Sequence, residues 1–212
     1  MKMTIIMWDW DGTLVNTMPM HADLAAMCIE KHFGMDFQGA REKYLNTTGV
    51  PFDHQLRIIF PKAEKEKILS CVGEYHRKKI TYVYGNPKDF PETQEVIKNL
   101  QEKNIHQVIS SSTEEVIINE WAWKRDIWML ALGRETGTKK DHISKIRRAF
   151  PNEKIIFVSD SCGDMNLPAD ITIGVDVPRN KEELFWENGA KDVSSEPVSL
   201  VWLEGIRKFL VE

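Results

Sequence analysis

Residues 4–17 of this chain read TIIMWDWDGTLVNT, and this stretch determines how the rest of the sequence is interpreted. Its first five residues are apolar or β-branched and end at an acidic turn, which predicts a buried strand over 4–8. Side chains two apart in an extended segment point the same way, so Asp9 and Asp11 face one point while Trp10 turns away. At about 4 Å and an effective dielectric of about 20, two carboxylates repel each other by about 4 kcal/mol. A hard cation with oxygen ligands, such as Mg²⁺, offsets such repulsion, and we therefore expect a metal here.

Residues 9–17, DWDGTLVNT, resemble the pattern DxDGTLxxT, the first motif of the haloacid dehalogenase superfamily in its phosphatase branch. The resemblance implies that Asp9 is a nucleophile that becomes an aspartyl-phosphate. It also implies that Asp11 acts first as general acid and then as general base. The dehalogenase branch lacks the second acid, so Asp11 argues against dehalogenation, and Asn16 stands where the family often has Asp. An acidic turn that only caps a strand is the alternative interpretation.

Composition limits the classes of protein to which this chain can belong. Its 212 residues suit one domain, or a core with one inserted subdomain. The net charge of −4 lacks the basic excess of a nucleic-acid surface, and the first apolar run is too short for a signal peptide or a membrane span. Cys28, Cys71 and Cys162 form neither a disulfide framework nor a zinc spacing. We therefore expect a cytoplasmic protein with reduced thiols and with no nucleic-acid or membrane partner.

Two kinds of sequence pattern divide the chain. Residues 17–83 carry helical spacing without a convincing strand, whereas 84–212 alternate between helices and strands. Strand patterns occur at 106–110, 128–132, 155–159 and 171–175, and helical patterns at 19–33, 40–45, 52–60, 63–80, 92–103, 113–124, 140–150, 181–188 and 198–210. We predict an α/β fold with a Rossmann-like parallel sheet flanked by helices. The core comprises 1–16 and 84–212, and 17–83 form a helical cap inserted after the first motif.

Ser110 and Ser111 follow the strand pattern at 106–110 and precede a helix pattern. Hydroxyl and backbone N–H groups at a helix start bind phosphate oxygens, although such serines also commonly cap helices. Ligands of parallel sheets bind at the carboxyl ends of the strands, where the first motif also lies. Ser110 resembles the second motif of the superfamily, and we predict that both serines bind phosphate.

Asp160 and Asp164 follow the strand pattern at 155–159 and resemble the fourth motif of the superfamily. The resemblance implies that Asp160 is a magnesium ligand and that Asp164 is its direct or water-mediated partner. Together with Asp9 and Asp11, these acids would surround one octahedral Mg²⁺ ion. An acidic loop after a strand is the alternative.

The third motif of the superfamily is a lysine that neutralises the nucleophile and the phosphate, and Lys139 and Lys140 are both candidates. Lys140 stands three residues before Ile143, which the helical spacing turns inward. We therefore favour Lys140 over Lys139 as the phosphate-binding lysine.

These residues together predict a magnesium-dependent phosphatase that hydrolyses a small phosphomonoester, either phosphoglycolate-like or a sugar phosphate, through an aspartyl-phosphate. The predicted partner is a small phosphorylated metabolite, and the protein is a monomer or small homo-oligomer. The helical insertion resembles the cap of the phosphoglycolate phosphatase and β-phosphoglucomutase subgroup, and residues 48–52 resemble that subgroup's substrate-specificity loop. A mutase of the β-phosphoglucomutase type is therefore one alternative. The mutase has Lys where Thr48 stands and Arg where Phe52 stands, which argues against it. A non-hydrolytic phospho-acceptor is the other alternative, but such modules lack a cap and a second acid.

Overall fold

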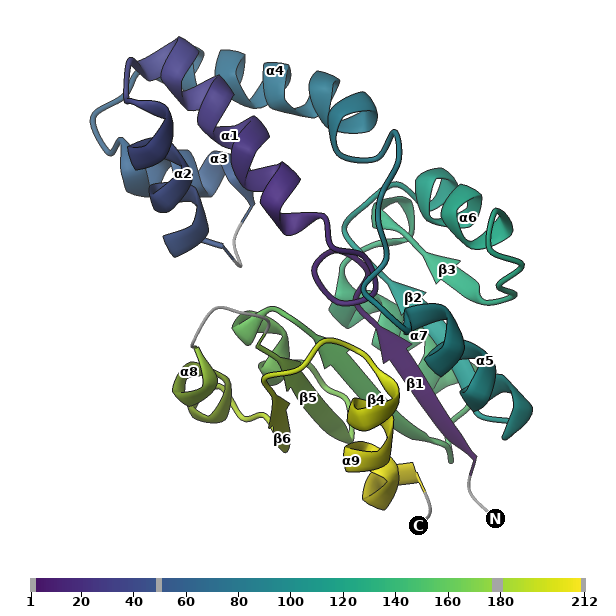
Figure 1. Ribbon diagram of the computed structural model, residues 1–212. Helices are drawn as coiled ribbons and strands as arrows, with labels where there is room; N and C mark the ends of the chain where they lie inside the picture. Colours follow the sequence, from purple (N-terminus) through teal and green to yellow (C-terminus); the bar gives the residue numbers. More distant parts are fainter. Residues whose placement is uncertain (1–2, 49–50, 177–180, 211–212) are drawn as a thin grey trace. The chain divides into compact units, whose positions relative to one another are not determined.

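The computed structural model describes residues 3–48, 51–176 and 181–210 (Figure 1). The chain divides into two compact units, a core unit of residues 1–16 and 88–212 and a helical unit of residues 17–87. The sequence patterns had placed the second boundary between residues 83 and 84. The two ends of the helical insertion are joined within the core unit. The N–H of Asn16 donates to the carbonyl of Lys88 at 2.7 Å, and Val15 forms an antiparallel bridge with Asp89.

Six parallel strands form one sheet among the described residues, in the order β3-β2-β1-β4-β5-β6. Their bounds are β1 Thr4–Trp8, β2 His106–Ser110, β3 Leu130–Leu132, β4 Lys154–Ser159, β5 Ile171–Val175 and β6 Asp192–Ser194. Trp8 pairs with Ile109 on β2 and with Val158 on β4, so the carboxyl ends of these three strands lie level with one another. The order reverses at β1, and open parallel sheets bind ligands beside such a reversal. The predicted α/β fold is confirmed.

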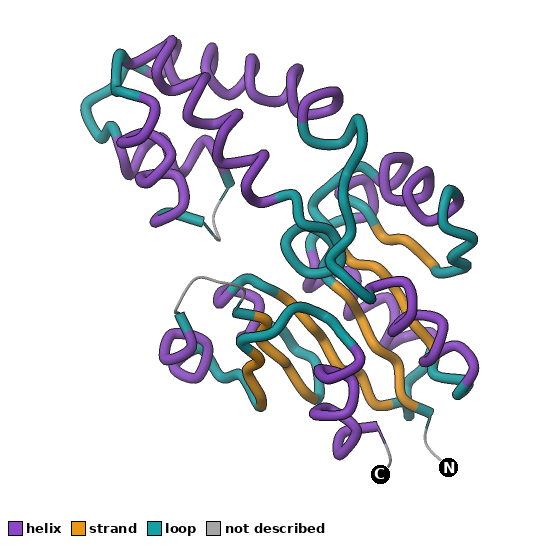
Figure 2. Tube along the Cα trace, viewed as in Figure 1, coloured by secondary structure: helices purple, strands orange, loops and turns teal. Residues whose placement is uncertain are grey.

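Helices cover both faces of this sheet (Figure 2). Their bounds are α5 Thr93–Glu102, α6 Glu115–Trp123, α7 Lys139–Ala149, α8 Glu182–Glu187 and α9 Leu200–Leu210, with short 3₁₀ helices η1 Arg134–Thr136 and η2 Cys162–Asn166. On one face α9 packs against β1, where the rings of Trp8 and Trp202 lie 5.3 Å apart. On the other face α7 presents Ile143 and Ile146 to the sheet.

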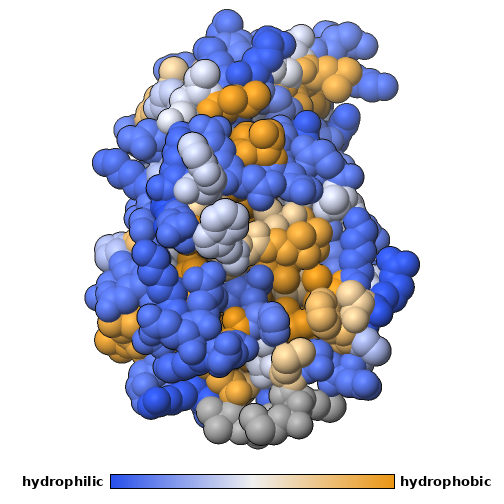
Figure 3. Space-filling view, turned by 90° about the vertical axis from the view of Figure 1, so that its right-hand side faces the viewer, coloured by the Kyte–Doolittle hydropathy of each residue, from blue (hydrophilic) through white to orange (hydrophobic). Residues whose placement is uncertain are grey.

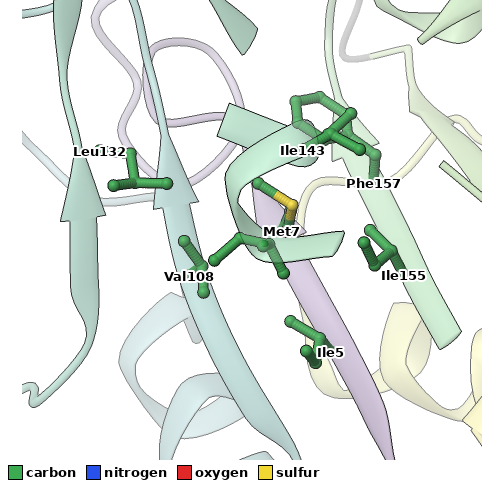
Figure 4. Packing of buried hydrophobic residues seen from close by; sticks show 8 residues of the cluster. Ile5, Met7, Val108, Leu132, Ile143, Ile155 and Phe157 are labelled. Carbon is green, nitrogen blue, oxygen red and sulfur yellow. The ribbon is translucent and has the colours of Figure 1, made fainter. Parts of the chain in front are cut away.

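The packing between α7 and the sheet anchors the strand ends (Figure 4). Met7, Val108, Ile143 and Phe157 belong to one cluster of buried side chains on this face. Full burial of each such side chain stabilises the fold by about 1.5–3 kcal/mol. Every residue of β1 is buried, as expected for a central strand of a parallel sheet with helices on both faces.

The described part of the helical unit contains α1 Met18–Phe33, α2 Phe37–Asn46, α3 Phe52–Ile59 and α4 Lys65–Tyr82. Helix α1 packs against α2 and α4. It ends at Gly34, whose φ of 72° lies in the left-handed region that glycine adopts without strain. Glu74 on α4 accepts hydrogen bonds from Lys31 and His32 on α1, which ties the two helices together. Gly49 and Val50, in the stretch that resembles a specificity loop, lie outside the described residues.

Some element bounds differ from the sequence patterns. Strand β6 was not predicted, because a three-residue run carries too little periodicity to be recognised. Helix α2 begins three residues earlier than predicted, because the Asp36 side chain caps it by accepting the N–H of Gly39.

Within the described ranges, each helix is too short or too polar to cross a lipid bilayer. Figure 3 views the molecule from the side of α6 and β3, where apolar patches interrupt a largely hydrophilic surface. Trp123 and Trp128 are 75% and 79% exposed, whereas Trp121 is buried and donates to Asp89.

Candidate active site

Asp9 directly follows β1 and lies almost fully buried at the carboxyl end of the sheet. Its N–H donates to the carbonyl of Val158 at 2.8 Å, so the pairing with β4 continues through this residue. Oδ1 accepts from Nζ of Lys139 at 2.9 Å, and Oδ2 accepts from the Ser159 hydroxyl at 3.1 Å. Both carboxylate oxygens are therefore held in fixed positions by neighbouring elements.

Lys139 is the first residue of α7, and its Nζ lies 2.5 Å from Oδ2 of Asp164 as well as beside Asp9. A capping box starts the helix, because Thr138 and Asp141 each bond the other's backbone N–H with a side-chain oxygen. This cap makes residue 139 the first helical position and turns it toward β1. Lys140 is exposed. The structure therefore places Lys139, and not the preferred Lys140, beside Asp9 and Asp164.

Ser159 ends β4 and lies between two carboxylates. Its Oγ lies 3.1 Å from Oδ2 of Asp9 and 2.6 Å from Oδ2 of Asp164, and it accepts the N–H of Ser161 at 3.1 Å. Asp164 belongs to η2, the turn that follows β4. The Ser159 hydroxyl therefore links Asp9 to the turn that follows β4.

The burial and the mutual charges of Asp9, Lys139 and Asp164 shift the pKa values of Asp9 and Lys139. Burial raises the pKa of Asp9, repulsion from Asp164 and Asp160 raises it further, and Lys139 acts in the opposite direction. For Lys139, burial lowers the pKa, but attraction to Asp164 and Asp9 outweighs this effect and the pKa lies above its ordinary value. Lys139 therefore favours its charged form, and its single charge is shared between Asp9 and Asp164, with Asp160 as a third acidic side chain close to Asp9.

This excess of negative charge fits a divalent cation. Asp160 directly follows β4, is 8% exposed, and donates its N–H to Oγ1 of Thr13 at 3.0 Å. Mg²⁺ is commonly held by one or two carboxylates together with water and substrate phosphate. Asp9 and Asp160 directly follow the neighbouring strands β1 and β4, so they are the candidates for such a donor pair, whereas Asp164 lies further along, in η2.

The four carboxylates predicted as metal ligands do not form a preassembled cage. Among the described residues, no three His, Cys, Asp or Glu side chains converge as metal ligands. The side chain of Asp11 accepts a hydrogen bond from the Thr113 hydroxyl at 2.7 Å. The metal-binding roles of Asp9, Asp11, Asp160 and Asp164 therefore remain predictions.

Asp11 lies in a tight loop that turns back after β1. Gly12 has a φ of 76°, and its N–H donates to the carbonyl of Val15 at 2.8 Å. The N–H groups of Leu14 and Val15 both bond the carbonyl of Trp10. These bonds hold Asp11, which is partly exposed, in the loop two residues after Asp9.

Ser110 ends β2 and is fully buried, with its Oγ 2.9 Å from Nδ1 of His142 on α7. Nε2 of His142 lies 3.2 Å from the carbonyl of Gly133 and 3.0 Å from Oγ1 of Thr136. A carbonyl only accepts, so Nε2 carries the proton. Burial lowers the pKa of His142, which favours the neutral ring, and Nδ1 then accepts the hydroxyl proton of Ser110.

This arrangement does not support the predicted phosphate-binding role of Ser110, because His142 accepts its hydroxyl proton. Ser111 is better suited, since its Oγ accepts the N–H of Thr113 at 3.1 Å and keeps its own proton for donation. The N–H of Ser111 itself donates to the carbonyl of Leu132 at 3.0 Å.

Sequence reasoning missed four side chains that organise the site, namely Thr13, Thr113, His142 and Ser159. Ser159 had a usable signal, because it is the last residue of a strand and lies next to Asp160. The contacts of Thr113 and His142 join residues 102 and 32 positions apart in sequence, and local patterns carry no signal for them.

Comparison with known proteins gives a consistent picture. Residues 6–173 match the family described as haloacid dehalogenase-like hydrolase. No curated protein matches the chain significantly.

Among solved structures, similar folds occur in three provisionally assigned proteins. A haloacid dehalogenase-like hydrolase from Bacteroides fragilis has a TM-score of 0.78 and 18% identity, covering 95% of this chain and 100% of the other. A β-phosphoglucomutase from Bacteroides vulgatus has a TM-score of 0.77 and 14% identity, covering 100% and 91%. A phosphoglycolate phosphatase from Lactobacillus delbrueckii subsp. bulgaricus has a TM-score of 0.75 and 15% identity, covering 100% of both chains. At these identities the likeness shows the fold.

The family match spans most of the chain, and Asp9, Lys139 and Asp164 meet at the carboxyl ends of the sheet strands. This chain belongs to the haloacid dehalogenase-like hydrolase family.

Proposed function

We propose that this protein is a magnesium-dependent phosphatase that hydrolyses a small phosphomonoester through an aspartyl-phosphate on Asp9. One observation carries the proposal. Asp9 lies buried at the end of β1 with Lys139 on one carboxylate oxygen and Ser159 on the other, and a second acid, Asp11, follows two residues later. A carboxylate fixed in this way is suited to attack phosphorus in line.

The reaction divides between the two acids. A carboxylate oxygen of Asp9 attacks phosphorus and forms the aspartyl-phosphate, while Asp11 gives its proton to the departing alkoxide. Asp11 then takes a proton from water, and the resulting hydroxide attacks the phosphorus and releases Asp9 and inorganic phosphate. Asp11 ends each cycle protonated again, so protons balance.

Positive charge and hydrogen-bond donors hold the transferred group. Lys139 neutralises charge on Asp9 and the phosphoryl oxygens, and the Ser111 hydroxyl donates to one of those oxygens. Asp9 and Asp160 would hold Mg²⁺, which neutralises negative charge on the phosphoryl group when it is bound.

The helical unit, residues 17–87, is proposed to act as the cap that selects the substrate. Phosphoglycolate-like molecules and sugar phosphates are the proposed substrate classes, and the partner is this metabolite alone, with the protein as a monomer or small homo-oligomer in the cytoplasm. A mutase remains the second candidate, because one of the similar folds is a provisionally assigned β-phosphoglucomutase. Thr48 and Phe52 favour hydrolysis over that alternative.

The proposal is tested by phosphate release from a panel of small phosphomonoesters, with Mg²⁺ and with EDTA, for wild type and Asp9→Asn. Release that requires Mg²⁺ and disappears in Asp9→Asn supports the phosphatase and ranks its substrates. Phosphate release retained in Asp9→Asn contradicts the proposed nucleophile. If no ester is cleaved but Asp9 takes label from a sugar bisphosphate or acetyl phosphate, the mutase or phospho-acceptor alternative takes its place.

A further inference from the structure

Thr113 lies in the loop between β2 and α6, is 1% exposed, and donates its hydroxyl proton to Oδ2 of Asp11 at 2.7 Å. Loop side chains are ordinarily mobile, but the backbone of Thr113 is held on both sides. Its N–H donates to Oγ of Ser111, and its carbonyl accepts the N–H of Arg134 at 3.1 Å. The hydroxyl therefore reaches Asp11 from a fixed point.

A hydroxyl that donates to one carboxyl oxygen decides where the acid carries its proton. As long as the Thr113 hydroxyl donates to Oδ2, that oxygen acts as the carbonyl oxygen of a protonated Asp11, and the acidic proton lies on Oδ1. The same bond restricts rotation of the carboxyl group about its terminal torsion, which is otherwise broad. Proton transfer depends on such orientation, because the acid must lie within hydrogen-bond reach of the leaving oxygen.

We propose that Thr113 is a positioning residue that orients the Asp11 carboxyl group for proton transfer to the leaving group. It also connects two parts of the site, since Ser111, which we propose to bind phosphate, holds the backbone of Thr113. The inference rests on the proposed phosphatase function, and it assigns to the loop after β2 a part in acid catalysis besides phosphate binding.

The test uses leaving groups that differ in their need for a proton. An alkoxide must be protonated as it departs, whereas p-nitrophenolate leaves as a stable anion. The value of kcat/KM includes steps only up to the release of the alcohol or phenol, so it reports this proton transfer. We compare the alkyl phosphate that wild type cleaves fastest, from a panel that includes phosphoglycolate, with p-nitrophenyl phosphate.

Thr113→Val keeps the shape of the side chain and removes the hydroxyl. We expect kcat/KM for the alkyl phosphate to fall by about tenfold to a hundredfold, and that for p-nitrophenyl phosphate to change by less than about threefold. Thr113→Ser restores the donor and should recover most of the activity on the alkyl ester. Thr172→Val, which removes a buried hydroxyl bonded to the carbonyl of Met165, is the matched control and should affect both esters little.

Equal losses on the two esters in Thr113→Val, or no recovery in Thr113→Ser, would overturn the positioning role and leave a structural one. Thermal unfolding of each variant establishes that a loss does not arise from misfolding. If wild type cleaves neither ester, the phosphatase proposal itself is wrong and the inference fails with it. If wild type cleaves the esters but Thr113→Val changes kcat/KM for both esters by the same factor, only the inference about Thr113 is contradicted and the phosphatase proposal stands.

Discussion

Nζ of Lys139 lies 2.9 Å from Oδ1 of Asp9, so the first residue of α7 reaches the residue that directly follows β1. Lys139→Met keeps the length of the side chain and removes the charge. We expect kcat to fall by about a hundredfold to a thousandfold, as for loss of one transition-state donor in other enzymes. Steady-state phosphate release provides the measurement.

Lys140→Met is the matched control for that change, because Lys140 is the exposed neighbour on the same helix. Its kcat should stay within about twofold of wild type, since screened surface charges contribute little. A loss in Lys140→Met that equals the loss in Lys139→Met would contradict the assignment of Lys139.

Substitutions of Ser110 and Ser111 should have different effects, one on the free energy of unfolding and the other on kcat/KM. Ser111→Ala removes the proposed phosphate donor, and we expect kcat/KM to fall by about tenfold or more. Ser110→Ala instead leaves Nδ1 of His142 without its donor, which should cost about 1–3 kcal/mol of unfolding free energy with kcat/KM nearly unchanged. Urea unfolding together with phosphate release measures both. A larger loss of kcat/KM in Ser110→Ala than in Ser111→Ala would restore Ser110 as the phosphate ligand.

His142 should make stability depend on pH. Burial lowers its pKa in the folded protein, so below a pH of about 6.5 the unfolded chain binds protons that the folded chain does not. The free energy of unfolding therefore falls as pH drops from about 7.5 through the folded-state pKa. His142→Gln removes this proton uptake, so its loss of stability over the same range should be smaller. Urea unfolding at several pH values tests this prediction. If the free energy of unfolding falls with pH equally in wild type and His142→Gln, the prediction is wrong.

Magnesium should stabilise the folded protein through Asp160. At a free Mg²⁺ concentration a hundredfold above Kd, a ligand that binds only the folded state contributes about 2.7 kcal/mol. For a chain of this size we expect a rise in melting temperature of about 5–11 °C, reversed by EDTA, with loss of turnover in EDTA. Asp160→Asn should reduce that shift and raise the Mg²⁺ concentration needed for turnover. Asp126→Asn, at an exposed position after α6, is the control that should behave like wild type.

The sheet could be predicted from sequence because its strands are buried on both faces and therefore appear as continuous apolar runs. Asp9 and Asp160 could be placed at this edge of the sheet because they directly follow such runs, where the ends of parallel strands meet, and Asp164 lies in the short turn after β4. The alignment of β1 with β2 and β4 then brings Asp9 level with Ser110 and Ser159 without further information.

The preference for Lys140 relied on an inward position later in the helix, whereas the structure places Lys139 beside Asp9. The capping pair Thr138 and Asp141 carried the better signal, since an N-cap at 138 makes 139 the first helical residue. The partner of Ser110 could not be predicted, because it depends on how α7 is rotated against the sheet. That rotation follows from the packing of Ile143 and Ile146, which no local pattern specifies.

The hydrogen bond between Asn16 and Lys88 has a consequence for evolution and engineering. The segment 17–87, of 71 residues, leaves and re-enters the core at neighbouring points. A change in the length of this segment therefore need not alter the position of β1. Such an insertion is a replaceable module, and mutations can accumulate in it without displacing Asp9. With the proposed role of this unit as the cap, substrate choice and the chemistry of the core can change at different rates in evolution, and a unit transplanted from a relative needs only two matching junctions.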